Sequence, residues 1–111
     1  MPRGGNQGIN HSALIACIRD YLAVQGAWQM KVLGGMGQRP GIPDVLACLR
    51  GRLIAVEVKT GAAVLSAAQQ RERGALERAG ALYIEARRIE DVEDLLVAAG
   101  LVMPSLMRYG S

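Results

Sequence analysis

Two short apolar runs lie in the middle of the sequence, separated by Arg50 and Gly51. Residues 45–49 and 53–58 are almost continuously apolar and rich in branched side chains, which at this length is typical of buried strands rather than of helices. Glycine accepts the positive φ that a two-residue hairpin turn requires. The pattern therefore predicts an antiparallel hairpin that turns at Arg50 and Gly51.

Two segments on either side of this hairpin have the spacing of helices. Apolar residues recur every three or four positions from about residue 10 to residue 25, and Gly26 follows where a helix would end. Ser66 and Gln69 have the spacing of a capping box, which predicts a second helix over residues 67–79.

Two further strands and a third helix complete the pattern. Residues 28–33 and 81–86 read as strands, and residues 89–99 as an amphipathic helix. The order α-β-β-β-α-β-α predicts an α/β domain, a small mixed sheet flanked by helices. In the last helix we expect an inward apolar side and a solvated acidic side, formed by Ile89, Val92, Leu95, Leu96 and Ala99 and by Glu90, Asp91, Glu93 and Asp94, respectively.

Length and composition favour one domain with a polyanionic partner. The 111 residues suit a single domain over 9–100, with a flexible arm at 1–8 and a tail at 101–111 that packs on the domain or on a second copy. The formal net charge of +3 and the pI of about 9.2 suit a nucleic acid. No run is long enough to span a membrane, and no signal-peptide core is present, so a cytoplasmic location is expected.

The cysteines do not predict a metal centre. Cys17 falls in a helical pattern and Cys48 in a strand, and both are expected to be buried, reduced thiols. With a single histidine and no closely spaced cysteine pair, a structural zinc site is not expected.

The predicted hairpin brings two acidic side chains together. Counted outward from the turn, Asp44 faces Glu57, and Lys59 lies on the same side of the sheet. Like charges at opposed positions destabilise a sheet unless something positive lies between them. A divalent cation with oxygen ligands would satisfy this pair. A slip of one residue in the register would separate the two carboxylates.

These residues also carry a family resemblance. Pro43-Asp44 followed by Glu57-Val58-Lys59 resembles the PD-(D/E)xK nuclease motif. Gly41 before it and the Leu-Ser-Ala-Ala-Gln stretch at 65–69 make the chain similar to the virus-type replication-repair nuclease (VRR-NUC) family, over about residues 9–96. The resemblance implies a restriction-endonuclease-like fold and Mg²⁺- or Mn²⁺-dependent hydrolysis of DNA phosphodiester bonds.

The resemblance assigns roles to individual residues. Asp44, Glu57 and the backbone carbonyl of Val58 would hold the cation, and Lys59 would orient a water molecule or stabilise charge on the phosphate. Gln69 would lie in the active site, although it could equally serve only as a helix cap.

His11 departs from the family pattern. It falls where the family has a glutamate that reaches the metal site. It could be a metal ligand, a proton carrier or a phosphate contact, or a polar residue without a role. Loss of one carboxylate should weaken the binding of a hard cation.

Basic residues near the predicted site are candidates for DNA contacts. The glycine-rich loop 34–41 directly precedes the site, and with Lys31 and Arg39 it could meet phosphates, or it could be a plain connection. Arg71 and Arg73 lie on the helix predicted over 67–79, where part of the charge would be an ordinary solvated surface.

Three functions remain open from the sequence. The first is a structure-specific endonuclease, similar to a junction resolvase and acting as a homodimer in phage or prophage DNA replication or repair. The second is a nucleic-acid-binding module that has lost its chemistry, which the histidine at position 11 favours. The third is a structural dimer without a nucleic-acid partner, which would not bind DNA even at low salt.

Overall fold

The computed structural model describes residues 10–34 and 38–105. The arm predicted at 1–8 lies outside the described residues, as do residues 35–37 of the glycine-rich loop and residues 106–111 of the tail.

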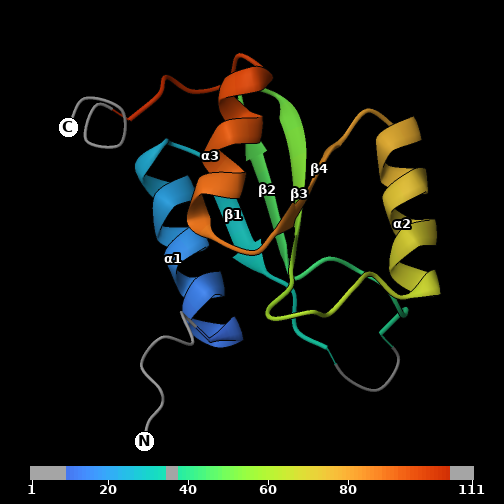
Figure 1. Ribbon diagram of the computed structural model, residues 1–111. Coiled ribbons are helices and arrows are strands. Elements are labelled where there is room, and N and C mark those ends of the chain that lie inside the picture. Colours follow the sequence, from blue (N-terminus) through green and yellow to red (C-terminus); the bar gives the residue numbers. More distant parts are fainter. Residues whose placement is uncertain (1–9, 35–37, 106–111) are drawn as a thin grey trace, which may run out of the picture.

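The elements follow the predicted order (Figure 1). They are α1 (His11–Val24), β1 (Trp28–Lys31), β2 (Val45–Leu49), β3 (Arg52–Val58), α2 (Ala67–Arg78), β4 (Leu82–Ala86) and α3 (Ile89–Ala98). The four strands form one sheet in the order β1-β2-β3-β4, in which β3 and β4 are parallel and the other pairs antiparallel. The predicted small mixed sheet flanked by helices is confirmed.

The hairpin has the predicted turn and register. Cys48 pairs with Leu53 and Leu46 with Ala55. Arg50 and Gly51 have φ values of +51° and +80°, as expected for a tight turn in which both central residues are left-handed. Because side chains alternate along each strand, this register fixes which residues reach each side of the sheet.

Both α1 and α2 begin at the same end of the sheet, the lower end in Figure 1. Asn10 caps α1 by accepting a hydrogen bond from the backbone N–H of Ala13 at 2.8 Å. Ser66 and Gln69 form the predicted capping box at the start of α2.

Among residues 10–34 and 38–105, no helix combines the length and the apolar character that crossing a bilayer requires.

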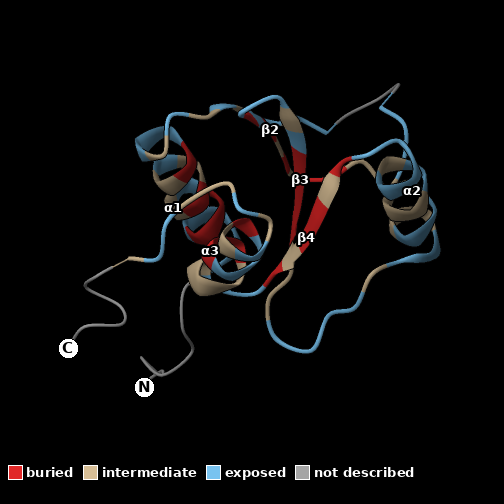
Figure 2. Ribbon diagram, turned by 90° about the horizontal axis from the view of Figure 1, so that it is seen from above, coloured by how far each residue is buried: buried red, intermediate tan, exposed pale blue. Residues whose placement is uncertain are grey.

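The core lies between the sheet and the pair α1 and α3, which cover the same side (Figure 2). We call this the inner side, and the side that carries α2 the outer side. Leu14, Ile18 and Leu22 of α1 pack there with Val92 and Leu96 of α3. The sheet contributes the alternate, fully buried residues Val45, Ala47, Ile54, Val56, Val58, Ile84 and Ala86.

The outer side of β1 and β2 is open, so the predicted burial of Cys48 is wrong. Cys48 points to this side and is exposed, while Cys17 is half-buried; both are free thiols. The uncovered surface includes Trp28, Met30 and Leu53. The reason is that α2 packs against β4 and leaves the β1–β2 part of the outer side without a covering helix.

The predicted sides of α3 also need correction. Glu93 is only 6% exposed, and its Oε2 accepts a hydrogen bond from the backbone N–H of Ser105 at 2.6 Å. Leu95 is 39% exposed instead of buried. Glu93 lies one turn beyond Ile89 and next to Val92, so it belongs to the inward side of the helix and holds the segment that follows Leu101.

Candidate active site

The residues predicted to carry the chemistry meet at the end of the sheet where α1 and α2 begin. Asp44 lies one residue before β2, and Glu57 is the penultimate residue of β3. Lys59 follows β3, His11 is the first residue of α1, and Gln69 is in the first turn of α2. The site is therefore built by the two central strands and closed from both sides by helix N-termini.

Asp44 is fixed by both neighbouring strands. Its Oδ2 accepts a hydrogen bond from the backbone N–H of Val58 at 2.8 Å, and its carbonyl oxygen accepts one from the N–H of Val32 at 2.8 Å. Val32 lies just beyond β1, which ends at Lys31 and is therefore shorter than the strand predicted over residues 28–33. Asp44 is thereby held next to the end of β3 although it lies outside the sheet ladder.

Glu57 is a buried carboxylate with few partners. The residue is 3% exposed, and its Oε2 accepts a hydrogen bond from Gln69 Nε2 at 3.1 Å and lies 3.8 Å from Lys59 Nζ. Its Oε1 is buried, and no donor among the described residues reaches it. Burial, and next the nearby charge of Asp44, raise the pKa of Glu57 to about 8, against the opposing effect of Lys59.

Gln69 serves the helix and the site together. Its Oε1 accepts the backbone N–H of Ser66 at 2.8 Å, while its Nε2 donates to Glu57 at 3.1 Å. The two interpretations of this residue from the sequence are therefore compatible, because an amide can accept at its oxygen and donate at its nitrogen.

His11 reaches the same group of atoms from the opposite helix. Its Nε2 lies 3.1 Å from the carbonyl oxygen of Val58 and 3.5 Å from Asp44 Oδ2. The imidazole is 47% exposed. The histidine thus lies beside the two oxygen atoms that the family resemblance assigns to a cation.

Gly41 permits the close approach of the Asp44 loop to α2. It has a φ of +87°, and a Cβ atom there would lie 2.4 Å from the carbonyl oxygen of Ala68. Because that oxygen belongs to the backbone of a helix, it has little freedom to move away. Only glycine fits both the backbone conformation and the contact, and this contact joins the segment that carries Asp44 to the turn that carries Gln69.

The donor set fits a divalent cation. Asp44 lies close enough to Glu57 for its charge to raise the pKa of Glu57, and Oε1 of Glu57 is buried without a partner among the described residues. Oxygen atoms of this kind are the ligands that Mg²⁺ and similar ions prefer. Within the described ranges, no group of three or more His, Cys, Asp or Glu side chains is gathered as a metal centre. A site here would therefore need the backbone carbonyl of Val58 as well.

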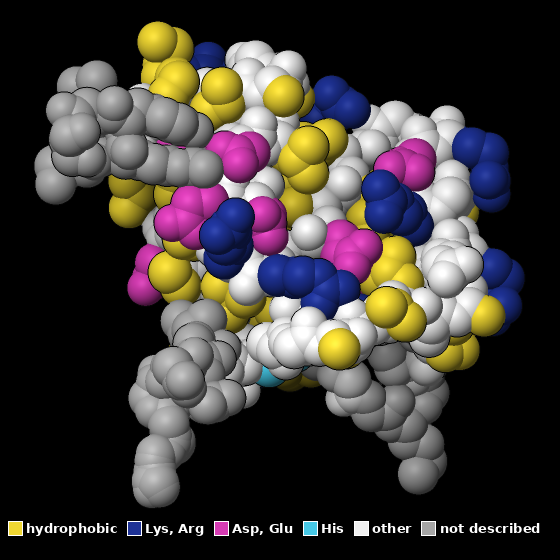
Figure 3. Space-filling view, in the orientation of Figure 1, with side chains coloured by type: hydrophobic (Ala, Val, Ile, Leu, Met, Phe, Trp, Pro, Cys, Tyr) yellow, Lys and Arg dark blue, Asp and Glu magenta, His cyan; other side chains and the backbone are white. Residues whose placement is uncertain are grey.

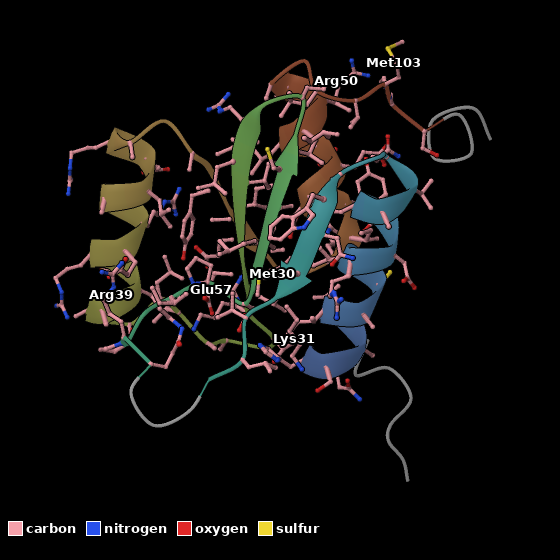
Figure 4. The ribbon with its side chains drawn as sticks, turned by 180° about the vertical axis from the view of Figure 1, so that it is seen from behind. Met30, Lys31, Arg39, Arg50, Glu57 and Met103 are labelled. Atoms are coloured by element: carbon pink, nitrogen blue, oxygen red, sulfur yellow. The ribbon has the colours of Figure 1, made fainter. Side chains whose placement is uncertain are left out.

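The basic residues predicted to contact DNA are distributed around this site (Figure 4). Glu57 lies between the sheet and α2, with Arg39 against α2 and Lys31 on the other side, near the start of α1. Arg39 is 71% exposed but pairs with Glu72 at 3.1 Å. Lys31 and Arg71 are exposed.

Arg73 is engaged in contacts with other side chains of the domain. It pairs with Glu77 at 3.3 Å and with Glu85 at 3.9 Å, and it lies over the ring of Tyr83, 5.2 Å from the centroid. Figure 3 shows this mixing of charge, since basic and acidic side chains alternate over the visible surface without one large basic patch.

Tyr83 and Glu85 are neighbours of the site that sequence reasoning missed. Pairing of β3 with β4 places Tyr83 beside Ala55 and Glu85 beside Glu57, on the outer side. The hydroxyl of Tyr83 is buried with no partner among the described residues; burial, and next Glu57, raise its pKa. No motif marks these residues, and only the register of the parallel pair could have found them.

A hollow leads to Asp44 from the open part of the outer side. It has a volume of about 280 Å³ and is lined mainly by residues 38–44. A groove of about 570 Å³ adjoins it and is lined by Met30, Lys31, Leu33, Arg39 and Leu46, among others. A chain of phosphates could therefore approach Asp44 along a surface that carries one lysine and one arginine.

Comparison with known proteins identifies the fold. A solved structure described as a VRR_NUC domain superposes with a TM-score of 0.66 and 25% sequence identity, covering 78% of this chain and 94% of that one. The chain has the VRR-NUC fold. The resemblance predicted from the sequence is thus confirmed, and the fold is that of a nuclease. No protein-family model and no curated protein matches the chain.

Proposed function

We propose that this VRR-NUC chain is a metal-dependent endonuclease that hydrolyses phosphodiester bonds of DNA. The observation that carries the proposal is the buried Glu57 beside Asp44, with Lys59 Nζ at 3.8 Å and Gln69 Nε2 at 3.1 Å, on a nuclease fold. A buried carboxylate with a partnerless oxygen is costly for stability, and such groups occur where a site needs them.

Asp44, Glu57 and the carbonyl of Val58 would hold one or two Mg²⁺ or Mn²⁺ ions. When bound, such an ion polarises the scissile phosphate and lowers the pKa of a water molecule, so that hydroxide is available at neutral pH. The hydrogen bond from Val58 N–H holds Oδ2 of Asp44 beside the end of β3, where the ion would bind.

Lys59 would hold the attacking water molecule or the charge that builds on the phosphate. Its side chain is only 14% exposed, so solvent screens its charge little. Gln69 would keep Glu57 in place through its hydrogen bond, and the N-terminus of α2 would favour the negative phosphate.

DNA would be held by Lys31, Arg39, Arg71 and Arg73, of which the first three are exposed. Arg39 would have to exchange Glu72 for a phosphate, and Arg73 would have to leave its acidic partners. A homodimer that cuts branched DNA, as a junction resolvase does, in phage or prophage replication or repair and in the cytoplasm of a bacterial host, is the biological setting we propose.

A panel of cleavage reactions tests the proposal. Junction, flap, single-stranded and duplex DNA would be incubated with Mn²⁺, Mg²⁺ or EDTA, and we expect cleavage that requires the ion. Asp44→Asn, Glu57→Gln and Lys59→Met should each lower the rate about a hundredfold or more. Asp20→Asn, an exposed acid on α1, is the matched control and should retain full activity. Full activity in any of the three variants would remove that residue from the mechanism.

A binding module without chemistry is the second candidate. The observation in its favour is His11, an imidazole in a position where the family has a carboxylate. Such a protein would retain its affinity for DNA in EDTA and would nick no substrate with either ion, which is the opposite of the result expected above.

A further inference from the structure

Three atoms around the end of β3 have the spacing of metal ligands. His11 Nε2 lies 3.1 Å from the carbonyl oxygen of Val58 and 3.5 Å from Asp44 Oδ2. Adjacent ligands of an octahedral ion at about 2.1 Å are separated by about 3 Å. His11 Nε2 therefore lies at the separation of adjacent ligands from the carbonyl oxygen of Val58, and about half an ångström beyond it from Asp44 Oδ2.

We propose that His11 is a nitrogen ligand of the cation and that the site consequently prefers Mn²⁺ or a similar transition ion over Mg²⁺. This inference rests on the proposed metal-dependent function. Mg²⁺ selects oxygen ligands, whereas imidazole suits the first-row transition ions. With His11 in the set, the first ligands would be one nitrogen, one carboxylate and one carbonyl, in addition to Glu57.

The setting of His11 allows this role. Its backbone is fixed at the start of α1 by the Asn10 cap, while its ring is 47% exposed and can exchange protons with water. Without an ion, Nε2–H donates to the carbonyl of Val58. Ion binding requires the neutral tautomer with its proton on Nδ1, and water can take the Nε2 proton and deliver one to Nδ1.

In the described parts of the chain, no three acidic, histidine or cysteine side chains are gathered as a metal centre, so Glu57 would have to move toward the ion to complete this set. Two of the first three ligands are side chains and the third is a backbone carbonyl. The alternative role for His11 is a hydrogen bond that occupies the carbonyl of Val58 and competes with an ion. The two roles predict opposite effects of removing the imidazole.

Pulsed electron paramagnetic resonance of bound Mn²⁺ tests the inference directly. Because His11 is the only histidine in the chain, imidazole nitrogen coupling to Mn²⁺ can come from no other residue in tag-free protein. We expect this coupling in the wild type and its loss in His11→Ala, His11→Gln and His11→Glu. DNA is left out, so the result does not depend on cleavage.

Affinities measured on the same samples give the ion preference. The concentration of free Mn²⁺ is measured from its electron paramagnetic resonance signal at room temperature. The affinity for Mg²⁺ is measured from its competition with Mn²⁺. His11→Ala and His11→Gln should weaken Mn²⁺ binding about tenfold or more. In His11→Glu the preference for Mn²⁺ over Mg²⁺ should fall by a similar factor, because an oxygen ligand replaces nitrogen. Circular dichroism of each variant checks that the fold is intact.

The results separate this inference from the proposed function. Mn²⁺ bound without nitrogen coupling, or bound more tightly by His11→Ala than by the wild type, would overturn the role of His11 and leave the metal-dependent nuclease standing. Failure of the free protein to bind either ion at millimolar concentration would also overturn it. Only the further absence of cleavage by the wild type with both ions would overturn the nuclease itself.

Discussion

Replacement of Glu57 by glutamine should remove a pH dependence from the stability of the cation-free protein. Burial and the charge of Asp44 raise the pKa of Glu57 from 4.5 to about 8. Between these values the native chain keeps a proton that the unfolded chain has lost. Native protein therefore binds more protons than unfolded protein, and the free energy of unfolding must decrease as the pH rises through this interval.

The expected size follows from the two pKa values. One pH unit corresponds to about 1.4 kcal/mol for one proton, so between pH 5 and pH 8 this carboxyl can contribute at most about 4 kcal/mol. A domain of this size has a total stability of about 5–15 kcal/mol. Within this range the loss is largest at pH 8, where about half of the Glu57 carboxyl groups are ionised beside Asp44, with Lys59 and Gln69 as the compensating neighbours.

Urea unfolding in EDTA at pH 5, 6, 7 and 8 measures this dependence, with the single tryptophan, Trp28, as a fluorescent probe. The difference in stability between wild type and Glu57→Gln should change with pH by up to about 4 kcal/mol, whereas Asp20→Asn should follow the wild type. Added Mn²⁺ should stabilise the wild type most at pH 8 and Glu57→Gln much less, because the ion binds the ionised carboxylate. Parallel curves for wild type and Glu57→Gln in EDTA would refute the reasoning, since the buried carboxyl would then have an ordinary pKa.

Three further predictions concern packing. In urea titrations, Gly41→Ala should lower the free energy of unfolding by about 1–3 kcal/mol more than Gly26→Ala. Both glycines have φ near +88°, but only a Cβ at position 41 would meet a backbone oxygen. Equal losses would contradict the contact. In thiol labelling of the native protein, the exposed Cys48 should react faster than the half-buried Cys17, and Cys48→Ser should abolish the fast phase. Glu93→Ala should lower the free energy of unfolding by about 1–3 kcal/mol and expose the segment after α3 to limited proteolysis, because the partly buried N–H of Ser105 loses its acceptor; unchanged cleavage would rule out that anchor.

The hairpin and its two acids could be predicted from sequence because a strand has a period of two. Once the turn is placed at Arg50 and Gly51, each later position has its side of the sheet assigned. The pairing of Cys48 with Leu53 follows from this count and is what the structure has. Helix starts were equally accessible, since Ser66 and Gln69 cap α2 through side chains that the sequence shows directly.

What covers each side of the sheet could not be predicted, because it depends on where a helix packs. The apolar run through Cys48 suggested burial, yet α2 lies against β4 and leaves this residue exposed. The same limit applies to Glu93, whose buried carboxylate accepts a hydrogen bond from the N–H of Ser105, twelve residues later. Tyr83 reaches the site through a parallel pairing that no local pattern signals.

Gln69 can cap α2 and hold Glu57 at the same time. This double use helps a small domain to hold a buried carboxylate. The capping bond to Ser66 fixes the amide oxygen, so the amide nitrogen is already directed at Glu57 without further loss of side-chain freedom. Because Gly41 has no Cβ, the loop that carries Asp44 can contact the same turn. The bonds that begin α2 therefore also set the spacing between the acids, so the site is preorganised by the contacts that stabilise the fold.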